Sequence, residues 1–276
     1  MAYPVVSAPY GLLPINLIGG QVFAGSTRSI PIIYGESTSI YYGDFVKVLR
    51  GTVQRQAVTT AGGAAGMVGI FLGCSYTNPT TKQKQYSQYW PGGTLAGDAV
   101  AIVCDDPDTV FKAAIVASSG STTVTSCAPA MVGQNLQGSD LAGNANTGNS
   151  SNGLIIPAAT TSSAYVARVV GMVPDTAASL GTATYTSIST ATVTCSALPF
   201  ALPVGTDVAS IAANGQMIAS GSYVATAASA GATTVVLNAA PATAFVASST
   251  LVFTQYPEVL VKLNFGIHEY YTATAV

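Results

Sequence analysis

The stretch TATYTSISTATVTC, residues 182–195, shows the pattern that decides the fold. Threonines recur at alternate positions on one face, while the other face carries Ala183, Tyr185, Ala191, Val193 and Cys195. Successive side chains of a β-strand point to opposite faces, so this alternation predicts one long half-buried strand or a pair of shorter strands. No long segment shows the apolar spacing of an amphipathic helix. The sequence therefore predicts an all-β protein.

Short runs rich in Val, Ile, Thr, Tyr and Phe recur before this stretch, separated by Gly, Pro, Asn and Ser. We expect strands at Ser29–Tyr34, Phe45–Gln54, Met67–Tyr76, Lys84–Tyr89, Ala99–Cys104, Val110–Ile115, Leu154–Ile156 and Tyr165–Val173. Regular strand spacing with turn signals is typical of a compact β-barrel or sandwich.

The chain divides by composition into four parts. Residues 1–20 predict an extended N-terminal arm, because Pro4, Pro9 and Pro14 disfavour helix and the apolar residues between them need cover. Residues 21–179 form the main β-domain, with a Gly/Asn/Ser-rich loop at 118–153 that contains too few apolar residues to bury much surface. A Thr/Ala-rich β lobe follows at 180–256, and we expect a strand in 257–276 to return to the main domain.

The charge content argues against several classes of partner. Only 7% of the residues are charged and the net charge is −2, so no basic stripe exists for nucleic acid or an anionic membrane surface. No window approaches the roughly 20 consecutive apolar residues of a membrane-spanning helix. The start MAYPVVSAPYGLLP lacks the basic residues of a secretory signal, so we expect synthesis in a cytoplasm without export.

Candidate chemistry is sparse. Asp105, Asp106 and Asp108 can be a cation site, but after an apolar strand DDPDT is more typical of a turn. The one histidine, His268, has no nucleophile motif around it, and no sequence pattern pairs two carboxylates for glycoside hydrolysis. The four cysteines form no CxxC pair, which favours reduced, buried thiols. We expect no catalytic residues, no metal and no cofactor.

Aromatic and apolar residues predict contact surfaces instead. In the arm the candidates are Tyr3, Pro4, Tyr10, Leu12 and Leu13, which either lie on a neighbouring subunit or cross their own domain. A second candidate is the aromatic patch, defined as Tyr86, Tyr89 and Trp90, which is either a protein contact or a core anchor.

The order of motifs in residues 8–175 resembles the capsid decoration, or cement, proteins of tailed bacteriophages. The resemblance is carried by APYGLLPINLIGG, RSIPI, GDFVKV, GIFLGCSYT, YWPGG, DAVAIVCDDPDTVFKA, VGQN and NTGNSSNGLI. It implies a homotrimer on the exterior of the virion head, made in the host cytoplasm, that bridges major capsid proteins and stabilises the shell against DNA pressure. Residues 180–256 match this pattern least.

Two other functions stay open. An adhesin or fibre-like tail protein that binds a host surface would also use Gly/Ser/Thr-rich β structure such as 180–256. A carbohydrate-active enzyme is the third hypothesis, and it would need the paired carboxylates that the sequence does not indicate.

Overall fold

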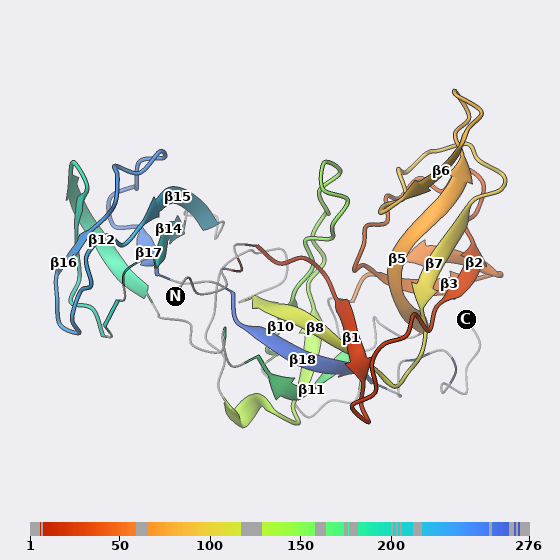
Figure 1. The fold of residues 1–276 in the computed structure, drawn as a ribbon, viewed down its shortest axis with the longest axis horizontal. Coiled ribbons are helices and arrows are strands. Elements are labelled where there is room, and N and C mark those ends of the chain that lie inside the picture. Colours follow the sequence, from red (N-terminus) through yellow and green to blue (C-terminus); the bar gives the residue numbers. More distant parts are fainter. Residues whose placement is uncertain are drawn as a thin grey trace. The chain divides into compact units, whose positions relative to one another are not determined.

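The computed structural model of the chain contains eighteen β-strands and one 3-10 turn, η1 (Pro129–Met131), among the residues that it describes (Figure 1). Those residues are 6, 8–58, 66–116, 129–157, 164–173, 176, 182–199, 201–202, 204, 206–211, 217–253, 256–264, 268 and 270. The predicted all-β class is confirmed. The strands form three sheets, one of which closes into a barrel.

Contacts divide the chain into two compact units. One, the two-sheet unit, comprises Pro9–Ala114, Pro129–Met172 and Val259–Val276. The other, the threonine unit, comprises Met1–Ala8, Ile115–Ala128 and Val173–Glu258.

The first sheet of the two-sheet unit, the ring sheet, closes into a five-stranded barrel. Its strands are, in order, β8 (Thr109–Val116), β10 (Leu154–Ile155), β9 (Asn135–Gly138), β11 (Ala167–Met172) and β18 (Glu258–Leu263). A further pairing of β18 with β8 closes the ring, and β1 (Leu13–Leu17) adds to the outer edge of β8. The C-terminal strand thus pairs antiparallel with β11, from Ala167 opposite Leu263 to Met172 opposite Val259.

The second sheet, the tryptophan sheet, surrounds the chain's single tryptophan. Its order is β2 (Arg28–Pro31), β7 (Val100–Cys104), β5 (Met67–Thr77), β3 (Phe45–Leu49) and β4 (Thr52–Arg55), and β6 (Lys84–Ser87) also pairs with β5. A bridge between Ile32 and Val53 brings the two ends of this order together. The predicted strand over residues 45–54 is two strands, because Arg50 and Gly51 both adopt positive φ and turn the chain.

Part of the predicted arm is built into its own unit. Leu12 is fully buried, and Leu13–Leu17 pairs with β8. The chain passes so close to Gly43 that a Cβ on Gly11 would lie 2.6 Å from the Gly43 carbonyl oxygen. Both glycines have positive φ, so the sequence PYGLLP docks here because these two residues lack side chains.

The Gly/Asn/Ser-rich segment differs from the unpaired loop that its composition predicts over 118–153. Its residues 135–138 form β9, a strand inside the closed ring. Leu136 is fully buried, and Asn135 Oδ1 accepts hydrogen bonds from Arg168 Nε at 3.0 Å and Asn264 Nδ2 at 3.2 Å. Polar residues can therefore occupy the ring because partners distant in sequence satisfy their hydrogen bonds.

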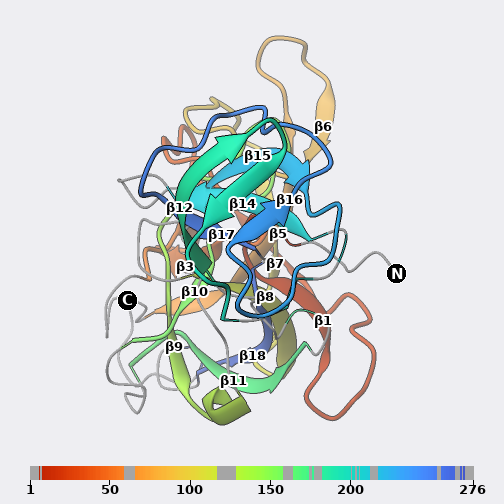
Figure 2. The ribbon, with the colours of Figure 1, turned by 90° about the vertical axis from the view of Figure 1, so that its left-hand side faces the viewer.

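The threonine unit contains one sheet of its own (Figure 2). The strand order is β15 (Met217–Tyr223), β14 (Asp207–Ile211), β17 (Thr250–Val252), β12 (Thr182–Ser189), β13 (Thr192–Cys195) and β16 (Thr234–Val236). A bridge between Val224 and Leu237 joins its two edges. The stretch 182–195 is a strand pair, since Thr190 turns the chain at φ 55°, and Ala183 and Tyr185 are buried as the alternation predicts.

Candidate interaction surface

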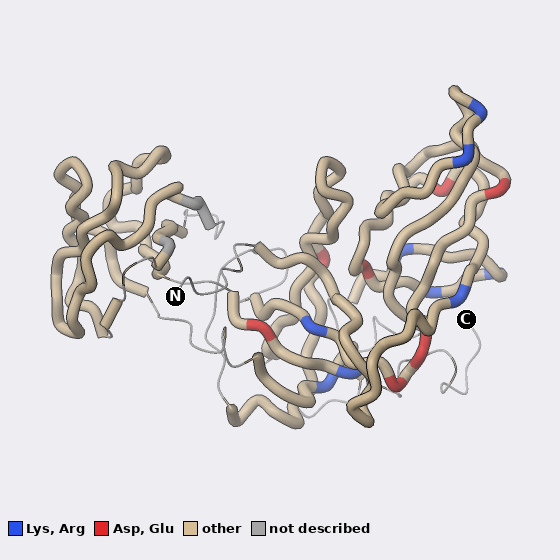
Figure 3. The backbone as a smooth tube through the Cα atoms, viewed as in Figure 1, with Lys and Arg blue, Asp and Glu red and all other residues tan. Residues whose placement is uncertain are grey.

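Nine charged side chains of the two-sheet unit form ion pairs with one another, and Figure 3 marks where charged residues lie along the backbone. The pairs are Arg28 with Asp105 at 2.8 Å, Lys84 with Asp98 at 2.8 Å, Lys262 with Asp108 at 2.6 Å, and Arg55 with both Asp44 and Asp140 at 3.3 and 2.5 Å. Opposite charges this close largely cancel one another's electric field at a distance. Each pair also joins two segments that are distant in the sequence.

The DDPDT segment is a turn in which the three carboxylates point to different partners. Asp105 pairs with Arg28 and accepts a hydrogen bond from the Tyr270 hydroxyl, while Asp108 pairs with Lys262. Asp106 Oδ1 accepts a hydrogen bond from the Asp108 amide at 2.9 Å, which is an Asx turn. Among the described residues no group of three His, Cys, Asp or Glu side chains is placed to hold a metal ion.

His268 is enclosed beside this turn. The residue is almost completely buried, its backbone forms a β-bridge with Met67 of β5, and its Nδ1 accepts a hydrogen bond from the Tyr270 amide at 3.3 Å. Burial lowers the pKa of His268, and the nearby Asp105 carboxylate opposes that shift. The described surroundings of His268 thus suit a structural histidine.

The cysteines that the structure describes are also enclosed. Burial raises the pKa of the Cys74 thiol to about 12 and that of Cys104 to about 11, and it raises the pKa of Cys195 as well. A thiol is nucleophilic as the thiolate, so burial disfavours the reactive form of these three side chains near neutral pH.

A buried carboxylate fastens the Asn-rich loop after β9 to the tryptophan sheet. Asp44 has no exposed side-chain surface, and its oxygens accept hydrogen bonds from Ser150 Oγ at 2.6 Å and Asn152 Nδ2 at 2.9 Å. The Tyr41 amide donates to it at 2.9 Å, and Arg55 completes the site. Burial raises the pKa of Asp44 above its ordinary value, and the hydrogen bonds from Ser150 and Tyr41 and the Arg55 charge lower it in part.

The structure separates the predicted contact residues. Tyr3 and Pro4 lie outside the described residues, Tyr10 and Leu13 are half-buried, and Leu12 is in the core. Leu12 therefore packs in its own unit, which is one of the two placements that the sequence left open for the arm.

The aromatic patch likewise divides between core and surface. Trp90 is fully buried, with its ring edge-on to Tyr76 at 5.3 Å and its Nε1 donating to the Glu36 carbonyl at 3.2 Å, so it takes the core-anchor position of the two that the sequence left open. Tyr89 stacks on Tyr41 with ring centroids 5.4 Å apart. Tyr86 alone stands out, with 81% of its surface exposed.

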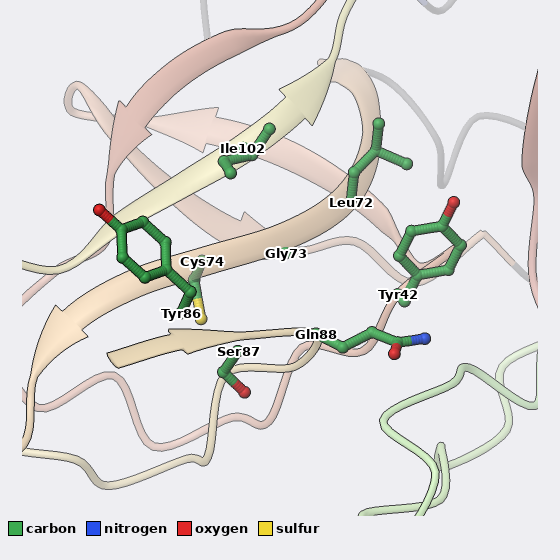
Figure 4. Close-up of a pocket in the computed structure, with 8 residues that line it drawn as sticks. All are labelled: Tyr42, Leu72, Gly73, Cys74, Tyr86, Ser87, Gln88 and Ile102. Atoms are coloured by element: carbon green, nitrogen blue, oxygen red, sulfur yellow. The ribbon is translucent and has the colours of Figure 1, made fainter. Parts of the chain in front are cut away.

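Tyr86 forms one rim of a shallow groove of about 450 Å³ on the tryptophan sheet (Figure 4). The groove crosses β7, β5 and the end of β6, and its lining is Tyr42, Leu72, Gly73, Cys74, Tyr86, Ser87, Gln88 and Ile102. Its shape comes from a β-bulge: Phe71 pairs with Val103 and Gly73 with Ile102, which leaves Leu72 as the extra residue.

No lining residue of the groove is charged, and several of its polar atoms are used within the chain. Ser87 Oγ donates to the Tyr89 carbonyl at 2.6 Å, and Cys74 Sγ donates to the same oxygen at 3.4 Å. Gln88 Nε2 donates to Asn149 Oδ1 at 2.5 Å. The surface left for a ligand is therefore mainly the tyrosine rings and the apolar groups of Leu72 and Ile102.

Sequence reasoning found Tyr86 but missed the other residues of the groove. Tyr42, Leu72 and Ile102 lie on three separate segments. The pairing of β5 with β7 brings Leu72 and Ile102 together, and the hydrogen bond from the Gly43 amide to the Phe71 carbonyl holds the segment of Tyr42 beside them. The single sequence signal was Gly73 inside the strand-like run GIFLGCSY, because a glycine in a strand interior often marks a bulge.

The threonine unit presents a different surface. Its three segments contain no Lys or Arg. Hydroxyl side chains meet across neighbouring strands, with Thr184 opposite Thr250, and Thr194 opposite both Ser187 and Thr234. These pairs place hydroxyl side chains next to one another on β12, β13, β16 and β17, in a unit without Lys or Arg.

No helix among the described residues is long and apolar enough to cross a bilayer. Comparison with known proteins finds no match: no family model, no curated protein and no solved structure is similar enough to this chain. The likeness to capsid decoration proteins stays a prediction from the motifs quoted above.

Proposed function

We propose that this chain is a structural virion protein that covers the outer surface of a tailed-phage head. In this role it binds the major capsid protein, bridges neighbouring copies and stabilises the shell against the pressure of packed DNA. The observation that carries the proposal is the exposed Tyr86 beside an uncharged groove, on a unit in which nine charged side chains form ion pairs with one another. Interface cores are depleted of charge and enriched in tyrosine.

The proposal includes a binding role without catalysis. The enclosed His268 and the protonated thiols of Cys74 and Cys104 support it, because neither group is poised to act on a substrate. The low charge supports a protein partner rather than nucleic acid or a membrane surface. We propose self-association as a homotrimer, which the mass of the purified protein in solution tests.

The neighbouring hydroxyl side chains of the threonine unit favour a second candidate, an adhesin or fibre-like tail protein that binds a host surface. Hydroxyl groups can hydrogen-bond to neutral polar surfaces, and the absence of Lys and Arg from this unit's sequence removes electrostatic attraction to anionic ones.

One experiment separates the two candidates. The purified protein is mixed with expanded, DNA-free heads, and the bound particles are isolated by sedimentation and reconstructed from electron micrographs. Density at three-fold positions on the head exterior is the expected result. In virions, density for this chain confined to the tail would favour the adhesin, and a failure to sediment with heads would overturn the first candidate.

A further inference from the structure

We propose that Asn152 is a site of spontaneous deamidation that the folded two-sheet unit holds closed, and that reaction there irreversibly detaches the Asn-rich loop. The residue is followed by Gly153, and it lies where the arm, this loop and Asp44 meet. The proposal is independent of the proposed function, because it rests on the chemistry of an Asn-Gly pair and on the contacts around it.

The Asn-Gly pair has the chemistry for this reaction. Glycine has no Cβ to hinder its own amide nitrogen, so an asparagine before it cyclises readily. The Gly153 nitrogen attacks Cγ of Asn152, forms a C–N bond and gives up its proton to water or hydroxide. The bond from Cγ to Nδ2 breaks, and Nδ2 takes up a proton and leaves as ammonia. Water then opens the cyclic succinimide at either carbonyl, which leaves aspartate or, with the main chain rerouted through Cγ, isoaspartate.

The fold holds both reacting groups in place. Asn152 Nδ2 donates to Asp44 Oδ1 at 2.9 Å, and Asn152 Oδ1 accepts from the Leu141 amide at 2.8 Å, so the side-chain amide is fixed from two sides. The Gly153 amide, which must lose its proton, donates to Ser139 Oγ at 2.7 Å. Asn152, Gly153 and Ser139 are all buried, which restricts the access of water. Ring closure therefore requires the loop to open first.

Either product would lose the contacts that hold the loop. In aspartate an oxygen replaces the Nδ2 donor, so two carboxylates would face each other at the buried position of Asp44, which is costly. In isoaspartate the main chain gains a carbon before Gly153. The Asn152 carbonyl, which accepts from the Gly11 amide at 2.8 Å, then leaves the main chain as a carboxylate. Reaction thus removes an anchor of both the loop and the arm.

The test compares deamidation of the full-length protein in native buffer and in guanidinium chloride at the same mildly alkaline pH. Peptide mass spectrometry and enzymatic methylation of isoaspartate measure the products. The second Asn-Gly pair of the sequence, Asn214 with Gly215, lies outside the described residues and is the chemical reference in the denaturant, where both asparagines should react at comparable rates. In native buffer Asn152 should react at least about tenfold more slowly than in denaturant, because only the opened loop reacts.

Variants test the contacts one at a time. Ser139→Ala removes the acceptor of the Gly153 amide and should raise the native rate at Asn152 about fivefold, the effect of losing one net hydrogen bond. Ser39→Ala is the matched control, since Ser39 Oγ accepts from the Gly92 amide in the same unit, and it should leave that rate unchanged. Asn152→Asp supplies one product directly. It should lower the urea midpoint of unfolding and speed hydrogen exchange at the Gly11 amide.

Each measurement can overturn the proposal. It fails if Asn152 reacts as fast in native buffer as in guanidinium chloride, or stays intact there while Asn214 reacts. Equal native rates in Ser139→Ala and Ser39→Ala would refute the closing role of the Gly153 contact. An Asn152→Asp protein as stable as the unmodified one would show that reaction does not detach the loop. If Ser139→Ala does not fold, the comparison of native and denatured unmodified protein still decides.

Discussion

Replacement of Asp44 by alanine should loosen the attachment of the Asn-rich loop to the tryptophan sheet. The carboxylate accepts from Ser150, Asn152 and the Tyr41 amide at 2.6 to 2.9 Å, and it lies 3.3 Å from Arg55 Nε. Arg55 keeps Asp140 at 2.5 Å and the Leu141 carbonyl at 3.0 Å, so the guanidinium retains partners. The three other donors do not, and each unsatisfied buried donor costs about 1–3 kcal/mol.

The expected loss follows from these contacts. Breaking a buried, hydrogen-bonded ion pair from one side costs about 3–5 kcal/mol, and relief of the carboxylate's own burial places Asp44→Ala near the lower end. For a unit of this size each kcal/mol lowers the melting temperature by roughly 2–4 °C, so a fall of about 10 °C is expected for this unit's transition. If the alanine variant does not fold, Asp44→Asn preserves the volume and one acceptor, and it should show a smaller fall.

Differential scanning calorimetry measures the transition, and amide hydrogen exchange locates the change. The Tyr42 amide donates a hydrogen bond to the Gly148 carbonyl, and the Ser150 amide donates to the Tyr42 carbonyl. In Asp44→Ala both amides should lose protection from hydrogen exchange. Asp98→Ala is the matched control, because Asp98 pairs with Lys84 on the exposed surface and such pairs add little to stability. A melting temperature for Asp44→Ala that matches that of Asp98→Ala would show that the buried network does not hold the loop.

Three further predictions follow from single features. Gly11→Ala should destabilise the two-sheet unit by at least about 1 kcal/mol, since it combines a positive φ with a backbone clash, and urea unfolding measures this. In a variant that keeps only Cys74 and Cys104, Ellman's reagent at pH 8 should react only after denaturation, and fast native labelling would contradict their raised pKa values. Asp44 and Asp98 should have opposite pH effects, tested by urea unfolding of Asp44→Asn and Asp98→Asn from pH 3 to 7. The raised pKa of Asp44 gives stability that is present below the ordinary value of 3.8 and lost as pH rises through the folded pKa. Asp98, whose pKa is lowered chiefly by the hydrogen bond from Lys84, gives stability that is present above 3.8 and lost as pH falls.

The sequence predicted the strands well where the evidence for them is local. The alternation in residues 182–195 depends only on the two-residue period of an extended chain, so burial of Ala183 and Tyr185 on one face could be expected. Local pattern did not predict the strand at residues 135–138, because its place in the ring depends on hydrogen bonds from Arg168 and Asn264 to Asn135. Composition predicts a loop there, and tertiary pairing makes it a strand.

The candidate site could be predicted only in part, for a related reason. An exposed tyrosine and a buried tryptophan lie only four residues apart in YSQYW, and nothing local tells which side chain turns inward. The pairing of β5 with β6 places Tyr86 opposite Ser75 and outside, while Trp90 turns in to meet Tyr76. The groove then needs one more fact, the one-residue bulge that sets Gly73 opposite Ile102. A change of one residue in that register would send the side chains that follow to the opposite face, so a surface of this kind is a property of strand pairing and not of any one strand.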